Sequence, residues 1–440
     1  MKDAPLITAC GLVTPFGVSL EALWDALVSG KSAVGPIDAS KAGFDGDGFA
    51  CKSAYHAISL MAEAPGVNPK DARIMNNHSY MLMKCSLDAF EGGKLEFFQG
   101  TEIAFYAGLG MVDYEIPDLL PAVVKSLDKK GGAEGGINVD VDNNVDVGIG
   151  IDPDVFYSKG YHSIHPLWPL SMLNNIALSQ VAVKLNLRGD SAVFSPHADS
   201  GAQAIIEGVN AIIEGFGKAA IAGGVSEKVN PLSVARGHLL GVLGGSCSPA
   251  PFSARRNGTV FGEGAAMFAI EKSSTASSRP VEPLARISGW GLSYGTNHSF
   301  GGPASDAIAS SMEKAMRMAS LKPLDIDVII ANGDGTVDGD AEEIRAINAF
   351  FGKTADKVKV YSSRGALGHL LAGAPAVDLA IASLILKNGL VPPTVTVLPI
   401  DGEVRFDLVV GSAARVGARR VLINALSYEG QSVSFIVEGV

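Results

Sequence analysis

The sequence contains 440 residues, of which 47% are hydrophobic and 18% are charged, and a chain of this kind buries a large core and is not disordered. Its formal net charge of -11 and the absence of a run of Lys and Arg argue against nucleic acid as a partner. No stretch approaches the roughly 20 uninterrupted apolar residues that span a bilayer, so we expect no membrane segment.

The N-terminus and the cysteines bear on the cellular compartment. The first apolar stretch is interrupted by Pro15 and Gly17 and has no cleavage site of small residues, so it does not resemble a signal peptide. The four cysteines are widely scattered, at Cys10, Cys51, Cys85 and Cys247. They show neither a disulfide framework nor metal-ligand spacing, which predicts a cytoplasmic location. We expect neither a metal nor a cofactor.

Short apolar runs bounded by glycine alternate with alanine-rich helical runs, which is the pattern of an α/β protein with buried strands. Residues 131–154 are dense in Gly and Asp and predict a loop excursion over about 128–157. Ser200–Gly215 predicts a helix with one apolar stripe and a terminal glycine as its stop signal. Lys218–Val225 and Asp327–Gly333 are predicted strands.

The two halves of the chain contain ordered internal similarities. Ile7–Leu12 reads ITACGL, and Ile287–Leu292 reads ISGWGL. Val193–Ser195 leads through a polar turn into an alanine-rich helical run, as does Val360–Ser362. Such echoes indicate an internal repeat of βαβ-rich halves, although a match of six residues can also arise by chance.

The repeat suggests a division of the chain into two domains. Ser273–Pro283 is rich in Ser and Pro and is typical of a connector. We therefore predict an N-terminal half over 1–272, which includes the loop excursion, and a C-terminal half over 284–440.

Several separate stretches resemble the β-ketoacyl synthases, the condensing enzymes of fatty-acid and polyketide assembly in the thiolase superfamily. They occur in the family's order and cover nearly the whole chain, at Leu6–Gly17, Glu21–Ser32, His165–Gly189, Ser195–Ile205, Lys218–Glu227, Ser248–Glu271, Gly333–Glu343 and Tyr361–Leu379. The resemblance implies an α/β thiolase-like fold in which two pseudo-repeated halves form a five-layered α-β-α-β-α architecture.

The family's chemistry uses a cysteine thiolate at a helix N-terminus, which takes the acyl chain, and two histidines. In the nucleophile motif, usually T-A-C, this chain reads Pro196-His197-Ala198, so that a methyl group stands in place of the thiol. Ala198 cannot form a thioester, and the resemblance therefore implies no cysteine catalysis by this chain.

Both histidine motifs can be located by the same resemblance. The first, usually H-G-T-G-T, reads Asn332-Gly333-Asp334-Gly335-Thr336 and has lost its histidine. The second retains His369, with Arg364 at the family's lysine position. By analogy with that lysine, we expect Arg364 to pair with Glu343.

The loop G-F-G-G, which helps gate the acyl pocket in active members, appears here as Ser427-Tyr428-Glu429-Gly430. Tyr428 and Glu429 are therefore pocket candidates. Three of the four active-site motifs are altered while the scaffold motifs are intact. We interpret these changes as release from catalytic constraint.

Other uses of the same residues can be considered. His369 is either a residual oxyanion donor or a core histidine held by its neighbours. His197 and Asp199 flank position 198, but adjacent residues on a tight turn point apart, which disfavours a new dyad. Ser195 and Ser200 lack an evident base and are disfavoured as nucleophiles.

Two acidic stretches loosely imitate calcium loops. The first includes Asp334, Asp340 and Glu343 but has Val337 where such a loop needs glycine, and the synthase motif explains these residues better. The second, residues 140–146, lacks the central glycine and favours a solvated loop.

Trp168 and Met172 lie in the stretch HPLWPLSML. The simplest interpretation is that they are packing residues. In related synthases this region lies near the dimer contact and the acyl tunnel, and both roles are compatible.

Members with an intact scaffold and no nucleophile are best known as chain length factors. The resemblance implies a non-condensing subunit that forms a heterodimer with a catalytic ketosynthase, shapes the acyl tunnel, and meets an acyl carrier protein mainly through its partner. Many chain length factors carry glutamine at the position of Ala198, which is a departure here.

Two alternatives stay open. A ketosynthase-like decarboxylase would act on a malonyl thioester with His369 and Asn332 as donors to the enolate, and would need no nucleophile. A self-sufficient acyltransferase or a homodimeric binding protein for acyl chains would require a new nucleophile or a preserved pocket, and no residue demands one.

Overall fold

The computed structural model describes most of the chain and divides it into two compact units. The first comprises residues 1–111 and 174–440, and the second comprises residues 112–173. The described residues are 5–38, 49–58, 75–111, 116–127, 151–245, 248–297 and 302–440.

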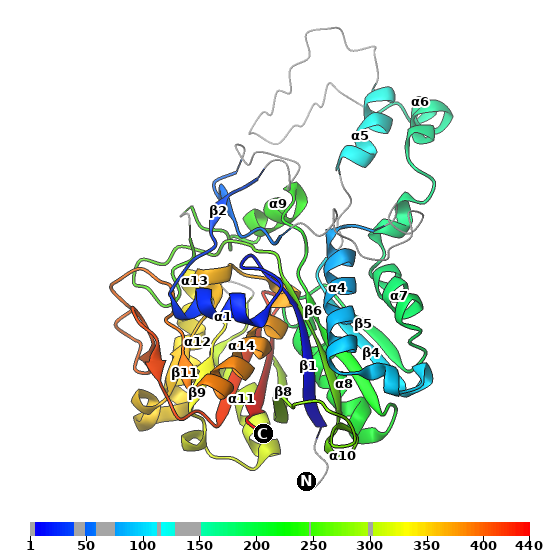
Figure 1. The fold of residues 1–440 in the computed structure, drawn as a ribbon. Coiled ribbons are helices and arrows are strands. Elements are labelled where there is room, and N and C mark those ends of the chain that lie inside the picture. The colour runs from blue at the N-terminus through cyan, green and yellow to red at the C-terminus, as the bar shows by residue number, and fades with distance from the viewer. Residues whose placement is uncertain are drawn as a thin grey trace. The chain divides into compact units, whose positions relative to one another are not determined.

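The first unit is built on a large mixed sheet (Figure 1). Among the described residues its eleven strands run in the order β12-β10-β9-β14-β15-β8-β1-β7-β6-β4-β5. Their bounds are β1 Pro5–Val13, β4 Ile103–Leu109, β5 Ser191–Phe194, β6 Ala219–Val225, β7 Ala265–Lys272, β8 Ala285–Tyr294, β9 Val328–Ile330, β10 Lys359–Tyr361, β12 Asp407–Leu408, β14 Arg420–Leu426 and β15 Gln431–Glu438. Two small ribbons pair β2 Gly35–Pro36 with β3 Ser53–Ala54, and β11 Leu390–Val391 with β13 Ala414–Arg415.

Ten of the eleven strands form two repeats of one strand pattern, and β12 adds a further parallel strand beside β10. In the order β5-β4-β6-β7-β1 the first two pairings are parallel and the next two antiparallel. The order β10-β9-β14-β15-β8 has the same directions. The half-sheets join where β1 pairs with β8 at Leu6–Arg286 and Ile7–Ala285.

This topology confirms the predicted pseudo-repeat. The similar segments Ile7–Leu12 and Ile287–Leu292 lie in the equivalent strands β1 and β8, and the starts of Val193–Ser195 and Val360–Ser362 lie in the equivalent strands β5 and β10. The domain limits 1–272 and 284–440 stay a prediction.

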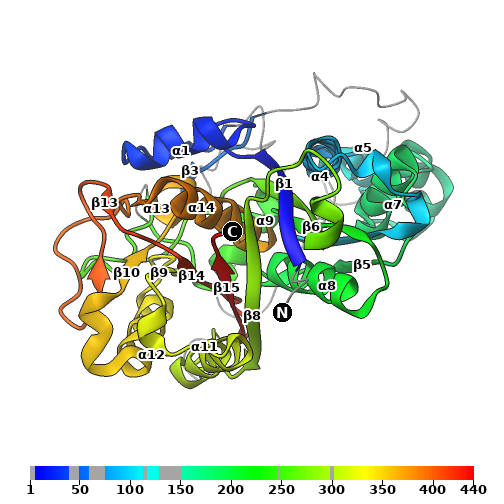
Figure 2. The same ribbon diagram turned by 60° about the horizontal axis from the view of Figure 1, so that its bottom comes forward.

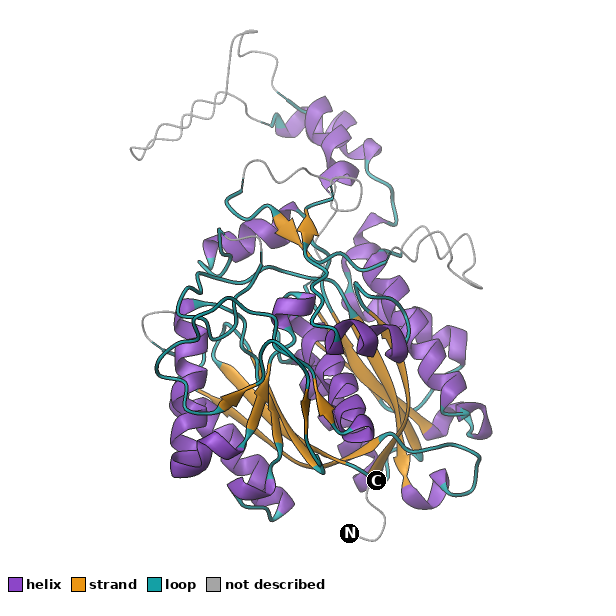
Figure 3. Cartoon of the chain, turned by 60° about the vertical axis from the view of Figure 1, so that its left-hand side comes forward, coloured by secondary structure: helices purple, strands orange, loops and turns teal. Residues whose placement is uncertain are grey.

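Helices on both faces of the half-sheets complete the five layers (Figures 2 and 3). Two helices cover the outer face of the first half-sheet, α4 Asn77–Gly92 and α7 Asn174–Leu185. Two lie between the half-sheets, α8 Ser200–Glu214 and α14 Ala374–Asn388. Two cover the outer face of the second, α11 Ser305–Ala319 and α12 Val337–Phe351. Among the described residues of this unit, the remaining α-helices of four or more residues are α1 Leu20–Val28, α9 Pro231–Leu239, α10 Ser273–Ala276 and α13 Arg364–Leu367.

Helix α8 shows why the sequence pattern predicted it correctly. Ile205, Val209 and Ile212 are buried in the central cluster, as the stripe requires. The helix ends at Gly215, whose φ of 85° is left-handed and favours glycine. Ile213 in the same helix is 43% exposed and does not belong to this buried stripe.

The central layer also explains the most apolar segment of the chain. Leu371–Asn388 is long and apolar enough to cross a membrane by composition alone, but 83% of this window is buried inside the protein. Most of it is the core helix α14, packed between the two half-sheets. The cytoplasmic location stays a prediction.

The second unit is mainly helical where it is described. Its elements are α5 Ile116–Lys125, α6 Pro153–Val155, a π-helical turn at Phe156–Gly160, and 3₁₀ turns at Tyr161–Ser163 and Trp168–Met172. Lys125 Nζ donates to Ser163 Oγ over 2.7 Å, which connects α5 to the 3₁₀ turn at Tyr161–Ser163. Trp168 and Met172 are half-buried. Most of the predicted loop excursion, residues 128–150, lies outside the described residues.

Candidate active site

Ala198 lies in the turn between β5 and α8 and is 6% exposed. It belongs to a hydrophobic cluster that includes Phe261 and Leu371, with Tyr428 packed against it. Gly201 fixes this turn, because a Cβ added there would lie 2.2 Å from the carbonyl oxygen of Ala372. The first turn of α8 is therefore held closely against the chain that follows His369.

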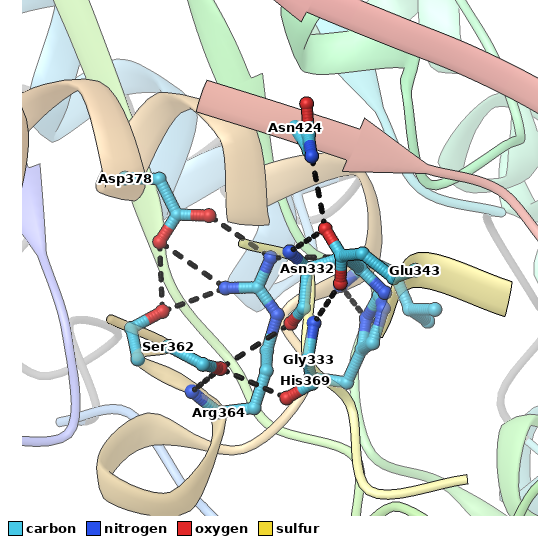
Figure 4. A network of polar contacts seen from close by, with 10 residues as sticks. Asn332, Gly333, Glu343, Ser362, Arg364, His369, Asp378 and Asn424 are labelled. Carbon is cyan, nitrogen blue, oxygen red and sulfur yellow. Dashed lines mark hydrogen bonds and ion pairs between the residues drawn. The ribbon is translucent and has the colours of Figure 1, made fainter. Parts of the chain in front are cut away.

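Glu343 organises the loop that follows β9. Its Oε1 accepts the Asn332 backbone N–H and Asn424 Nδ2, both over 3.0 Å, and its Oε2 accepts the Gly333 N–H over 2.8 Å (Figure 4). Burial raises the pKa of this carboxyl. Glu343 is a structural anchor for the loop in this arrangement.

Arg364 pairs with Asp378 of α14 (Figure 4). Its Nη2 lies 2.9 Å from Asp378 Oδ2, and its Nη1 donates to Ser363 Oγ over 2.6 Å. Nη2 also lies 3.4 Å from the side-chain oxygen of Asn332. The expected ion pair between Arg364 and Glu343 is not formed, because backbone and amide groups occupy the Glu343 oxygens.

Two partners in this network were not predicted from the sequence. Asp378 is the one charged residue within the apolar run APAVDLAIASLIL, and a lone buried charge of this kind requires a partner. The lone charge of Asp378 could therefore have predicted a buried ion pair from the sequence. Asn424 lies in the buried strand β14, and no local pattern connects it with Glu343, which is 81 positions away.

His369 is a neutral histidine with a defined tautomer. Its Nδ1 accepts the Leu371 backbone N–H over 3.0 Å, so the proton is on Nε2. Burial, together with the nearby Arg364 charge, holds its pKa well below the usual value. Nε2 is buried and has no hydrogen-bond partner within the part of the chain that the structure describes.

The depressed pKa of His369 predicts a pH-dependent stability. Below the ordinary value of 6.5 the unfolded chain binds a proton that the folded protein excludes, so the contribution of this group is present above pH 6.5 and lost as the pH falls. His369→Gln should flatten the dependence of the unfolding free energy on pH by about 1.4 kcal/mol per unit below 6.5. Urea unfolding of both proteins at several pH values measures this difference. Parallel curves would contradict it.

The loop at Ser427–Gly430 closes over the Ala198 turn. The Tyr428 hydroxyl donates to Asp334 Oδ2 over 3.0 Å, and its ring centroid lies 5.5 Å from that of His369. Burial and the Asp334 charge raise the pKa of Tyr428. The hydroxyl of Ser427 donates to Glu429.

His197 and Asp199 have separate partners. His197 Nδ1 lies 3.1 Å from Glu429 Oε2. Asp199 Oδ2 accepts Gln203 Nε2 over 2.6 Å, and burial raises the pKa of this carboxyl. The two side chains therefore do not form a dyad with each other.

Acidic side chains after β9 and in the first turn of α12 accept backbone N–H groups. Asp340 accepts the N–H groups of Phe252 and Gly335, and Asp334 accepts that of Thr336. Within the described ranges no group of three or more His, Cys, Asp and Glu could hold a metal ion. Residues 140–146 lie outside those ranges.

Comparison with protein families identifies the scaffold. A model described as the N-terminal domain of beta-ketoacyl synthase matches residues 5–276, and one described as its C-terminal domain matches residues 284–397. The chain belongs to the β-ketoacyl synthase family. A relative in Coxiella burnetii, named 3-oxoacyl-[acyl-carrier-protein] synthase 2, is 26% identical over 449 residues and covers 100% of this chain and 99% of its own length.

Solved structures of ketosynthases share the fold. The ishigamide ketosynthase/chain length factor matches with a TM-score of 0.84 and 21% identity. A type II polyketide synthase acyl-carrier protein in complex with its ketosynthase, bound to the hexaketide, matches with a TM-score of 0.79 and 20% identity. Both matches cover 100% of either chain. They confirm the predicted thiolase-like architecture.

The motifs of the β-ketoacyl synthase family can be compared with the residues of this site. Ala198 precedes helix α8 by two residues, and its assignment to the position of the family's cysteine, like that of His369 to the family's second histidine, stays a prediction. Asn332 has its side-chain oxygen turned to Arg364. Trp168 and Met172 belong to the other compact unit, and their role in a pocket stays a prediction.

Proposed function

We propose that this chain is a chain length factor: the non-condensing partner of a catalytic ketosynthase in polyketide or related acyl-chain assembly. The observation that carries the proposal is Ala198, buried at the N-terminus of α8 in an otherwise intact synthase scaffold. Condensation requires a thiolate at this point to hold the acyl chain. The nearby polar side chains His197 and Asp199 are engaged with Glu429 and Gln203.

The edge of the sheet supports a partner subunit. Among the described strands β5 is the outermost on its side, and its residues are exposed or half-buried, whereas β4 and β6 are buried throughout. Helices α7 and α8 both contact β5 and expose apolar side chains, including Val183 at 83% and Ile213 at 43%. Open strand edges with apolar neighbours favour pairing with another chain.

The partner class comes from the same family. One structure of similar fold is named as a ketosynthase/chain length factor, and another is a ketosynthase in complex with its acyl carrier protein. We propose a heterodimer in which the catalytic ketosynthase carries the acyl chain and receives the carrier protein. This chain would then complete the tunnel and stabilise its partner.

His369 supports one alternative, a malonyl-thioester decarboxylase. Its Nε2–H is buried and without a protein acceptor among the described residues, so it can donate to a thioester carbonyl as an enolate forms. Asn332 is the second residue assigned to this reaction, but its side-chain oxygen faces Arg364.

Co-expression with a catalytic ketosynthase tests the proposal. We expect a one-to-one complex by native mass spectrometry, condensation only when both chains are present, and a change in product length when the tunnel is altered. Ala198→Cys and Ala198→Gln should leave turnover of the complex nearly unchanged. The alternative is supported instead if the chain alone is a homodimer that decarboxylates a malonyl carrier protein and loses this activity with His369→Ala.

A further inference from the structure

We infer that five of the residues by which this chain departs from the synthase motifs form one polar latch, which holds the loop Ser427–Gly430 closed over Ala198. They are His197, Asp334, Ser427, Tyr428 and Glu429. The members of the latch come from three separate motifs. Its main bond joins Tyr428 to Asp334, and a second contact joins Glu429 to His197.

The hydrogen bond between Tyr428 and Asp334 requires that both residues differ from the family's motifs. The motifs place phenylalanine and threonine at these positions, and phenylalanine has no hydroxyl to donate. Here the hydroxyl donates to a carboxylate oxygen over 3.0 Å, and Asp334 is 2% exposed. A hydrogen bond to a carboxylate is stronger than one between neutral groups. The same carboxylate also receives the Thr336 hydroxyl over 2.7 Å, which fixes its orientation.

A second pair closes the outer end of the loop. Glu429 replaces a glycine of the motif, and His197 replaces the alanine that precedes the nucleophile. His197 Nδ1 and Glu429 Oε2 lie 3.1 Å apart, within ion-pair distance but without the alignment of a hydrogen bond, and the two side chains are 34% and 45% exposed, so this contact is the weaker of the two. The Ser427 hydroxyl, a third departure, donates to the same Glu429 oxygen.

The closed loop fills the space beside the nucleophile position. Tyr428 packs against the apolar cluster that contains Ala198 and Leu371, and its ring faces that of His369. The altered residues thus contact one another although they are far apart in sequence. Asp334 and Tyr428 are separated by 94 positions. Independent drift would not place them in pairs, so the loss of catalytic residues was accompanied by a rebuilt closure.

A cysteine reporter at position 198 tests the latch. In the full-length chain, Ala198→Cys should react slowly with iodoacetamide, as followed by mass spectrometry of the peptide that carries residue 198. Adding Tyr428→Phe keeps the ring and removes the bond, and should speed the reaction by about tenfold, the factor expected for loss of one hydrogen bond. Tyr157→Phe, which removes a hydroxyl from a side chain that is 72% exposed, is the matched control and should leave the rate unchanged.

Hydrogen exchange provides a second measurement that needs no cysteine. The amides of Ser427–Gly430 should exchange about tenfold faster in Tyr428→Phe than in the wild type, and Tyr157→Phe should match the wild type. Equal labelling rates, or equal exchange of this loop with and without the Tyr428 hydroxyl, would overturn the latch. Neither measurement requires a partner subunit, so their outcome is independent of the proposed function.

Discussion

Arg364→Ala should reduce the free energy of unfolding by about 3–5 kcal/mol, because it leaves a buried carboxylate without its counter-charge. The side chains of Arg364 and Asp378 are 1% and 0% exposed, and two guanidinium nitrogens face the two oxygens of the carboxylate. Ser363 contributes a further bond to the same carboxylate over 2.7 Å. Urea unfolding measured by circular dichroism gives the loss directly.

A double-mutant cycle separates the pair from other losses. Arg364→Ala with Asp378→Ala should be much less destabilising than the sum of the single changes, because no unpaired charge remains. Arg317→Ala is the control, since Arg317 forms an exposed helix-surface pair with Glu313 and should cost less than about 1 kcal/mol. If Arg364→Ala lowers the free energy of unfolding as little as Arg317→Ala does, water or another group replaces the guanidinium.

Ser191→Pro should weaken the proposed heterodimer by at least about tenfold, the effect of one lost hydrogen bond at the edge of β5. The carbonyl of Asp190 accepts the N–H of Phe105 in β4. Backbone groups alternate in direction along a strand, so the N–H of Ser191 points away from β4 toward the open edge. In the free chain Asp190 Oδ1 accepts this N–H over 3.0 Å, and a pairing strand would replace that acceptor. Ser191 is exposed, and its replacement removes little packing.

Ser191→Ala keeps the backbone N–H and is the matched control. Association can be measured by titration of the purified ketosynthase, and circular dichroism checks that both variants are folded. If Ser191→Pro binds the partner as tightly as Ser191→Ala does, the edge of β5 is not the contact, and the supporting argument from this edge fails.

The fold could be predicted in detail because its signals are local. The apolar stripe and terminal glycine of Ser200–Gly215 define α8, and the runs at Lys218–Val225 and Asp327–Gly333 contain β6 and β9. The internal echoes were short, yet they mark strands at equivalent places in the two half-sheets. The spacing of apolar residues and the glycines and prolines that end helices and strands can both be read from residues close together in one sequence.

The site could be predicted only in part, because its contacts span long separations. The motifs identified the candidate active-site residues Ala198, Asn332, Glu343, Arg364 and His369. They did not predict that Arg364 binds Asp378, since the family's lysine suggested Glu343 instead. The Tyr428–Asp334 bond joins two changes that look like independent losses in the sequence. Only the folded arrangement shows that they contact each other.

The most direct test of the central claim is the intact mass of each subunit after the co-purified complex is incubated with an acyl carrier protein loaded with a starter acyl group. The catalytic ketosynthase should gain the mass of the acyl group, which hydroxylamine removes, while this chain should keep its unmodified mass. An acyl adduct on this chain, stable to gel filtration under denaturing conditions, would contradict the account and would show that another nucleophile replaces the missing cysteine.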